Sequence, residues 1–222
     1  MTDSQRSRFH SVLFEGARQY GIDLSGPVLD SFFSYYTMLS LRNTGTNLIS
    51  KCDISRFVEY HLLDSLKVAS VFDFSVVRTM MDFGSGAGLP GIPLSFAFPY
   101  ITATLIESRS KRVDFLKDVI TSFPFVKAQV IKTGIDSLSA SFNGTFDVVI
   151  TRATVKLKKF YSFSSRFLAP GGSLISIKGD SISAEVSELK SVLNKQFFNL
   201  TIRTPAPVAD VRSGTIVLIK RM

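Results

Sequence analysis

Side chains that form disulfides or bind zinc are scarce in this 222-residue sequence, which contains one cysteine and two histidines. The single cysteine, Cys52, cannot form a disulfide within the chain, and its isolation fits a reducing compartment. With so few thiols and imidazoles, no zinc site is expected. The first eight residues lack an apolar core, so they do not resemble a signal peptide.

Long hydrophobic runs are also lacking. Residues 83–106 contain no charged side chain, which is long enough to suggest a membrane span. Four glycines and three prolines interrupt this stretch, so it predicts a loop, a short helix and a buried strand. We therefore expect a soluble protein with no membrane partner.

Positive charge is abundant. Lysine and arginine together number 26 and aspartate and glutamate 18, which leaves a net charge of +8. This surplus favours a polyanionic partner, with nucleic acid preferred over an anionic membrane surface. Hydrophobic residues make up 45% of the chain, enough for a packed core.

The first 75 residues predict a helical extension without strands. Apolar residues at helical spacing indicate a helix over 5–20, and Gly26-Pro27 begins a second one. The polar segment 43–50 predicts a loop. Asp53 is expected to cap a third helix that continues to residue 69.

From residue 76 to 222, short apolar strands alternate with helices, which predicts an α/β domain. The expected strands lie near 79–83, 101–106, 127–132, 146–151, 173–178, 197–203 and 214–220. The expected helices lie near 90–98, 111–122, 156–167 and 182–194. Because no helix separates the last two strands, they should pair antiparallel in an otherwise mostly parallel, doubly wound sheet.

A glycine-rich loop follows the first predicted strand. Asp82 precedes Gly84, Gly86 and Gly88, and the sixth position of the pattern is Leu89. A dinucleotide fingerprint requires a glycine at that sixth position. The G-x-G-x-G spacing favours S-adenosylmethionine over NAD, with a purely structural glycine turn as the remaining alternative.

An acidic residue, Glu107, ends the next predicted strand, 19 residues after Gly88. A carboxylate at this place can accept both hydroxyl protons of a ribose. Both NAD and S-adenosylmethionine contain a ribose, so Glu107 supports nucleoside binding without choosing between them.

Several motifs together resemble the bacterial RsmG (GidB) family of small-subunit (16S) ribosomal RNA guanine-N7 methyltransferases. The extended loop Asp82–Leu94, with its Leu-Pro-Gly-Ile-Pro segment, is the most specific of them. The other similar segments are Asn43 with Asn47-Leu48, His61–Leu66, Ser108 with Lys111–Val113 and Phe115-Leu116, Phe146–Val149 with Arg152-Ala153, Leu168–Gly172, and Lys178-Gly179. The sequence departs from the family pattern at Arg42, Tyr60 and Gly134.

This resemblance implies a Rossmann-like class I methyltransferase fold that uses S-adenosylmethionine to methylate N7 of one guanine near the decoding region. The residues that it implies for cofactor binding are Gly84, Gly86, Gly88, Leu89, Glu107, Ile135, Asp136 and Arg152. The implied partner is small-subunit ribosomal RNA or the assembling 30S subunit, and we expect a cytoplasmic, metal-free monomer. Guanine N7 carries a lone pair and no proton, so no catalytic base is expected.

Some basic side chains and one histidine allow two interpretations each. His61, with Asp64 nearby, is either a packed histidine that ties the extension to the domain or a residue near the donor or RNA. Arg152 is either a site residue or a structural ion-pair partner. Two groups of basic residues are candidates for contact with RNA phosphates. For Arg109, Lys111 and Arg112, a solvated helix turn is an equal alternative. For Lys156, Lys158 and Lys159, RNA contact is favoured over a plain charged surface.

Two other functions remain open. An NAD-dependent oxidoreductase uses the same kind of fold, although the missing sixth-position glycine speaks against it. A non-catalytic RNA-binding module is the other, although such a module has no need of acids at both ends of a nucleoside.

Overall fold

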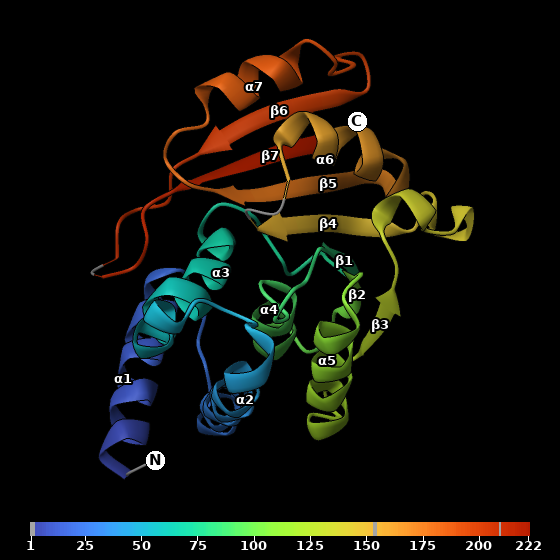
Figure 1. Cartoon of the computed structure of the whole chain (residues 1–222). Helices are drawn as coiled ribbons and strands as arrows, with labels where there is room; N and C mark the ends of the chain where they lie inside the picture. Colours follow the sequence, from blue (N-terminus) through green and yellow to red (C-terminus); the bar gives the residue numbers. More distant parts are fainter. Residues whose placement is uncertain (1–2, 153–154, 209) are drawn as a thin grey trace.

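The computed structural model describes residues 3–152, 155–208 and 210–222, without the side chain of Ile135. Within these ranges the strands form one seven-stranded sheet with helices on both faces (Figure 1). The strands are β1 Thr79–Phe83, β2 Thr102–Glu107, β3 Ala128–Lys132, β4 Phe146–Arg152, β5 Leu168–Lys178, β6 Phe198–Arg203 and β7 Thr215–Arg221. All seven predicted strands are confirmed. β5 begins five residues earlier than predicted.

The strand order is β3-β2-β1-β4-β5-β7-β6. Strands β1 to β5 pair in parallel, and β7 runs antiparallel to both β5 and β6, which confirms the predicted antiparallel pairing. β7 lies one position in from the edge because Ile216, Val217 and Ile219 bury its two faces, whereas much of β6 is exposed. The more apolar strand takes the interior place.

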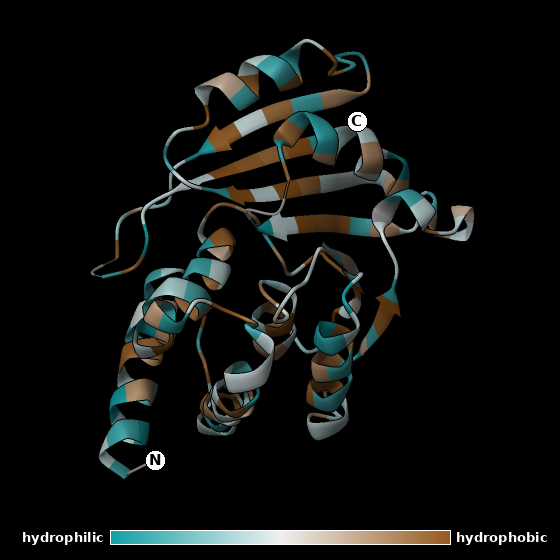
Figure 2. Cartoon of the chain, viewed as in Figure 1, coloured by the Kyte–Doolittle hydropathy of each residue, from teal (hydrophilic) through white to brown (hydrophobic). Residues whose placement is uncertain are grey.

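Successive residues of the central strands enter opposite cores. Met80 packs on one face of the sheet and Met81 on the other, and Val148 and Val149 divide in the same way. The first face is covered by α1 Asp3–Gln19, α2 Gly26–Thr46, α4 Gly91–Ala97 and α5 Ser110–Ser122, and the second by α6 Leu157–Ser164 and α7 Ser183–Lys190 (Figure 1). In Figure 2 hydrophobic residues follow β4, β5 and β7, while hydrophilic residues lie on the outward sides of the helices. One more α-helix in the described ranges, the short α3 Asp64–Leu66, lies in the N-terminal extension.

The third part of the N-terminal extension is not the regular helix that the sequence predicts. It consists of a 3₁₀ segment η1 Lys51–Arg56, a π-helical turn η2 Val58–Leu63, the short α3 and a second 3₁₀ segment η3 Lys67–Ser70. The remaining short 3₁₀ turns are η4 Ile135–Ser137, η5 Ala140–Phe142 and η6 Ser165–Phe167. π-Turns are rare and occur frequently at functional sites.

Two further predictions about the extension are wrong. The segment 43–50 is not all loop, because α2 continues to Thr46 and the side chain of Asn43 closes the following turn by two hydrogen bonds to the main chain of Ile49. Asp53 does not cap a helix, because η1 already begins at Lys51 and the Asp53 carboxylate faces Arg212 and His61 instead. The Asp53 side chain, which the local pattern predicts as a helix cap, instead forms an ion pair with the distant Arg212.

The extension shares a continuous apolar core with the sheet. One cluster of buried residues includes Leu13 of α1, Phe32 of α2, Phe96 of α4 and Ile216 of β7. Phe32 meets Phe96 edge to face, with ring centroids 5.1 Å apart. None of the helices in the described ranges combines the length and the apolar character that a membrane crossing needs.

Candidate functional site

The loop between β1 and α4 has the backbone conformation that its glycines predict. Gly84, Gly86 and Gly88 have φ angles of 71°, 59° and 95°, a region that residues with a Cβ rarely adopt. The amides of Gly84 and Ser85 both donate to the carbonyl oxygen of Ile106, each at 3.0 Å. The loop is therefore fixed to the end of β2.

Two glycines allow close packing around the loop. A Cβ at Gly88 would lie 2.6 Å from Cγ1 of Ile92, and a Cβ at Gly91 would lie 2.6 Å from Oδ2 of Asp82. The Gly91 amide donates to this same carboxylate oxygen at 3.0 Å. Glycine at position 91 thus lets the start of α4 approach β1 closely enough for the hydrogen bond.

Asp82 is fully buried at the end of β1. Burial raises its pKa to about 7, against the opposing effect of the Gly91 hydrogen bond and of the Arg152 charge. Among the described residues its second oxygen, Oδ1, has no hydrogen-bond partner. A buried acceptor without a partner, beside a glycine loop, is suited to meet a polar ligand.

Glu107 lies at the carboxyl end of β2 and is 5% exposed. Its Oε2 accepts from the Gly86 amide at 3.0 Å, and its Oε1 accepts from the amides of Ser108 and Arg109 at 2.7 and 2.8 Å. Nη1 of Arg112 stands 3.6 Å from Oε2. The carboxylate therefore joins the glycine loop to the start of α5.

A residue of the helical extension also holds the loop. Tyr35 of α2 is fully buried, and its hydroxyl donates to the carbonyl oxygen of Ala87 at 2.6 Å. Burial raises the pKa of this phenol, so it remains a donor. No motif in the sequence points to this contact, because it depends on the packing of α2 against α4 and α5.

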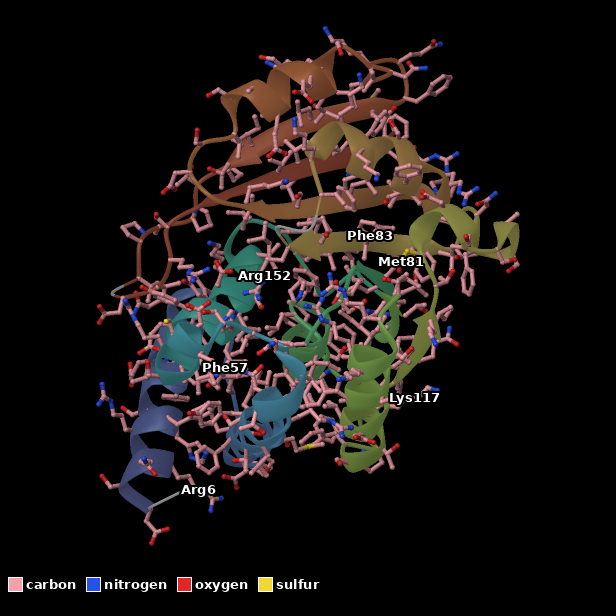
Figure 3. All side chains as sticks on the ribbon, viewed as in Figure 1. Arg6, Phe57, Met81, Phe83, Lys117 and Arg152 are labelled. Carbon is pink, nitrogen blue, oxygen red and sulfur yellow. The ribbon has the colours of Figure 1, made fainter. Side chains whose placement is uncertain are left out.

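Arg152, the last residue of β4, is bound by the extension. Its Nη1 lies 3.1 Å from Oδ2 of Asp64 and 3.3 Å from the carbonyl oxygen of Tyr60, and its Nη2 lies 3.0 Å from Nδ1 of His61. Figure 3 shows Arg152 between the α3 segment and the end of β4. The interpretation of Arg152 as a structural ion-pair partner is therefore confirmed, and its role as a site residue stays a prediction.

His61 is the packed, hydrogen-bonded histidine of the first interpretation. It is 5% exposed, and burial together with the charges of Arg152 and Arg212 lowers its pKa to about 3. An arginine has only N–H donors, so Nδ1 must accept and the proton lies on Nε2. Nε2 is 3.5 Å from Oδ2 of Asp53.

The other predicted residues lie around the same edge. Asp136 is exposed in η4, directly after β3, and the Ile135 side chain lies outside the described part of the structure. Arg109 and Lys111 are exposed, whereas Arg112 is half-buried beside Glu107. Lys156, Lys158 and Lys159 are all exposed at the start of α6, where Lys156 stands 3.6 Å from Glu188.

These residues lie at the topological switch point of the sheet, where the order in which successive strands are added reverses. The order β3-β2-β1-β4-β5 places the reversal between β1 and β4, and ligands of open α/β sheets bind at the carboxyl ends of the strands there. The hydroxyl of Thr151 donates to the Phe83 carbonyl at 2.9 Å and links the two strand ends. The glycine loop, Glu107 and Arg152 surround this point.

Comparison with known proteins identifies the family. The family model described as GidB, rRNA small subunit methyltransferase G, matches residues 29–206, which include the glycine loop, Glu107 and Arg152. The chain belongs to the rRNA small subunit methyltransferase G family. It is an S-adenosylmethionine-dependent methyltransferase that acts on small-subunit ribosomal RNA.

Relatives of this family match over most of the chain. The Ribosomal RNA small subunit methyltransferase G of Lachnoclostridium phytofermentans is 29% identical over 97% of this chain and 90% of its own length. The protein of the same name from Chlorobaculum tepidum is 31% identical over 83% of both chains. The predicted resemblance to the family is confirmed.

Solved structures of methyltransferases share the fold at low sequence identity. The mitomycin 7-O-methyltransferase MmcR aligns with a TM-score of 0.56 and 18% identity, over 72% of this chain and 54% of its own. The tRNA (m1A58) methyltransferase TrmI of Aquifex aeolicus aligns with a TM-score of 0.51 and 12% identity, over 65% and 62%. The predicted Rossmann-like methyltransferase fold is confirmed.

The residues at the switch point are suited to a nucleoside-type methyl donor. Positive φ angles open the loop backbone, and a Cβ at Gly86 would lie 3.8 Å from Arg112 Nη1 and 3.9 Å from the Gly84 carbonyl oxygen, with no other described neighbour within 4 Å. Asp82 supplies the buried acceptor without a partner, and Glu107 supplies a carboxylate at the end of β2. The described residues contain no group of three metal-ligating side chains.

Sequence reasoning missed three contributors to this region. They are Tyr35, which holds the glycine loop, Asp53, which was assigned to a helix cap, and Arg212, which binds Asp53 from the β6–β7 loop. All three act across large sequence separations. The motif around Asp82 did contain a local signal, because Gly91 lies at the position where only hydrogen fits against the Asp82 carboxylate.

Proposed function

We propose that this protein transfers a methyl group from S-adenosylmethionine to N7 of one guanine in small-subunit ribosomal RNA, near the decoding region. The observation that carries the proposal is the glycine loop at the β1–β4 switch point, within a family match that spans residues 29–206. The alternative of an NAD-dependent oxidoreductase is disfavoured by Leu89 at the sixth position of the loop.

The donor would be held by Gly84, Gly86, Gly88, Leu89, Glu107, Ile135, Asp136 and Arg152. Main-chain groups of the loop would contact it directly at Gly86, where the nearest side-chain atom, Arg112 Nη1, would lie 3.8 Å from an added Cβ. Oε2 of Glu107 would accept from the ribose hydroxyls in place of the Gly86 amide, while Oε1 remains bound to Ser108 and Arg109. Asp136, exposed after β3, would lie at the adenine end.

Catalysis in this site is a matter of positioning. S-adenosylmethionine supplies an electrophilic methyl group on a positively charged sulfur. Guanine N7 offers a lone pair without a proton, so the protein needs no general base. The role of the chain is to hold guanine N7, the methyl carbon and the sulfur of the donor in one line. Fixing two reactants in such a geometry supplies much of the rate enhancement of a two-substrate reaction.

Positive side chains near the switch point would hold RNA phosphates. Lys156, Lys158 and Lys159 are exposed at the start of α6, directly after the segment that follows β4. Arg109 and Lys111 extend from the start of α5. Arg112 faces the Glu107 carboxylate, which favours a role in holding the loop over a phosphate contact.

The test is methyl transfer from tritiated S-adenosylmethionine to 16S RNA, supplied both naked and within 30S subunits. We expect label at one guanine, mapped by primer extension after cleavage at N7-methylguanine. Calorimetry with the donor and with NADH accompanies the assay. Binding of NADH alone would favour the oxidoreductase, and donor binding without label in either substrate would favour a non-catalytic module.

Glu107→Gln tests the donor site itself. The amide nitrogen of glutamine donates where the carboxylate accepts from amides, so we expect at least tenfold weaker donor binding. Glu188→Gln is the matched control, because Glu188 is an exposed acid beside Lys156 and away from the loop. Equal donor affinity in both variants would remove Glu107 from the site.

We also infer that the protein acts as a metal-free monomer in the cytoplasm, where ribosomal subunits assemble. The chemistry of the reaction supports the inference that no metal is needed, since the donor already carries an activated methyl group. Full activity after treatment with a chelator, and a monomer mass by light scattering, are the expected results. Loss of activity with the chelator or a stable dimer would contradict them.

A further inference from the structure

Three acceptors on one turn of the helical extension hold the guanidinium of Arg152. Asp64 Oδ2, the Tyr60 carbonyl and His61 Nδ1 all come from residues 60–64, at 3.1, 3.3 and 3.0 Å. Residues 60–63 lie in the π-turn η2, and Asp64 follows it directly. A turn of rare geometry thus converges on one side chain at the end of β4.

The other ring nitrogen of this histidine faces an acid, without a hydrogen bond among the described residues. Nε2 of His61 faces Oδ2 of Asp53 at 3.5 Å, and Nη2 of Arg212 lies 3.1 and 3.2 Å from the two oxygens of Asp53. Arg212 belongs to the β6–β7 loop, 151 positions after His61 in the chain. A line of contacts therefore runs from that loop through Asp53 and His61 to Arg152.

A second line of contacts runs beside the first. Oδ1 of Asp64 lies 2.6 Å from Nζ of Lys67, and Nζ also donates to the carbonyl oxygen of Arg212 at 3.2 Å. The guanidinium of Arg212 stacks on the ring of Tyr60, 4.4 Å from its centroid, and that of Arg56 lies 3.9 Å from the same centroid. The ring of Tyr60 thus joins two arginines to the π-turn.

We propose that His61 is a positioning residue for methyl transfer, which accepts a hydrogen bond from Arg152 and keeps its guanidinium at the mouth of the donor site. Asp53 and Arg212 serve this role by orienting the imidazole so that Nδ1 faces Arg152. The inference rests on the proposed function, because it assigns a task to the Arg152 of that site.

The physical reason lies in the freedom of a long side chain. An arginine at the end of a strand has several rotamers, and each contact that selects one of them reduces the entropy lost when a substrate binds. Reactions that depend on alignment are sensitive to such placement, since a displacement of about 1 Å can reduce a rate about 100-fold. Only a neutral imidazole can serve here, because a protonated Nδ1 would repel the guanidinium.

Two substitutions of His61 separate positioning from packing. In His61→Asn the amide oxygen lies close to the place of Nδ1 and can accept from Arg152. In His61→Gln the longer amide reaches toward the place of Nε2 and can donate to Asp53, but the acceptor for Arg152 is lost. Both remove the same buried ring, which packs against Phe57 with centroids 5.5 Å apart.

We expect His61→Asn to keep the kcat for 30S methylation within about threefold of the native value, and His61→Gln to lose about 10- to 100-fold. Calorimetry with S-adenosylmethionine and thermal unfolding of each variant report the donor site and the fold separately. Equal losses in the two variants, or no loss in either, would overturn the proposal and leave His61 a packing residue.

A double-substitution cycle provides the second measurement. If His61 acts through Arg152, His61→Gln should cost less than twofold more once Arg152→Met has removed the guanidinium. A full additional loss in that background would overturn the proposal even if His61→Gln alone is impaired. These outcomes differ from failure of the proposed function, in which the native protein itself would transfer no label to small-subunit RNA.

Discussion

The hydroxyl of Tyr35 donates a 2.6 Å hydrogen bond to the carbonyl oxygen of Ala87, and both groups are buried. Tyr35 belongs to α2 of the N-terminal extension, and Ala87 lies within the glycine loop, 52 positions later. The loop is thus held from two sides, by Glu107 of β2 through the Gly86 amide and by the extension through the Ala87 carbonyl. The extension therefore helps to support the proposed donor site.

Tyr35→Phe should destabilise the protein and weaken donor binding. The substitution removes only the hydroxyl and leaves the Ala87 carbonyl buried without its donor, which costs about 1–3 kcal/mol. We expect this loss in the free energy of unfolding measured with urea, and a severalfold rise in the Kd for S-adenosylmethionine.

Tyr36→Phe is the matched control, because Tyr36 is the next residue of α2 and is half-buried. Its ring stacks on Phe57 with centroids 5.2 Å apart, and phenylalanine keeps that contact. A change of less than about 0.5 kcal/mol is expected for it. If the two variants behave alike, the Tyr35–Ala87 hydrogen bond does not support the loop.

Gly91→Ala should be destabilising because α4 begins in contact with β1. A Cβ at this position would lie 2.6 Å from Asp82 Oδ2 and 2.7 Å from Leu105 Cδ2, so the helix must move away. Overpacking of this kind costs about 1–3 kcal/mol.

Gly45→Ala is the opposite case, because position 45 lies within α2 with nothing within 4 Å of the added methyl group. It should stabilise the protein by about 0.5–1 kcal/mol. Thermal unfolding of both variants checks the prediction, and a native melting temperature for Gly91→Ala would contradict it.

Asp82 should make the protein less stable as the pH rises from 4 to 7. Its pKa is raised to about 7 in the folded state and is 3.8 for an ordinary aspartate, so in this window the folded state retains a proton that the unfolded state has lost. Stability is highest below the lower pKa and falls until the folded pKa is passed. The total change is on the order of a few kcal/mol.

The comparison that tests this is urea unfolding of the native protein and of Asp82→Asn across that pH range. Asparagine keeps an oxygen for the Gly91 amide but does not ionise. The difference in the free energy of unfolding between the two proteins should therefore shift in favour of the variant as the pH rises. Parallel pH profiles would mean that the burial of Asp82 does not raise its pKa.

The lysines at the start of α6 should contribute to RNA binding through phosphate contacts. Replacing both Lys158 and Lys159 with alanine should weaken binding to 16S RNA and reduce the slope of log K against log salt by about 1.4, since each contact with a single strand contributes about 0.7. Donor affinity should be unchanged, because these side chains are exposed and lie outside the glycine loop.

The control is the pair Lys117→Ala and Lys127→Ala, which removes the same charge elsewhere. Lys117 lies on α5 toward its carboxyl end (Figure 3), and Lys127 directly precedes β3, at the amino edge of the sheet. Filter binding at four salt concentrations gives both slopes. An equal reduction of the slope in the two double variants would show that only net charge, and not the α6 surface, attracts the RNA.

Local patterns determined much of this structure. The strands were predictable because runs such as Phe146–Ile150 are nearly continuous apolar stretches, as buried parallel strands require. The glycine loop was predictable because positive φ angles at alternate positions select glycine, and the acid at the end of β2 follows at a characteristic distance. Each of these signals lies within a few residues of the structure that it specifies.

Tertiary structure decided what surrounds the loop. Asp53 has the sequence context of a helix cap but binds Arg212, because η1 already begins at Lys51 and the β6–β7 loop brings Arg212 to the Asp53 carboxylate. The π-turn at residues 58–63 has no local signal, and its acceptors converge on an arginine about 90 positions away. Tyr35 resembles any core aromatic until α2 is packed against the sheet. Such contacts join side chains that are far apart in the chain, so only the folded arrangement of helices and strands determines which of them meet.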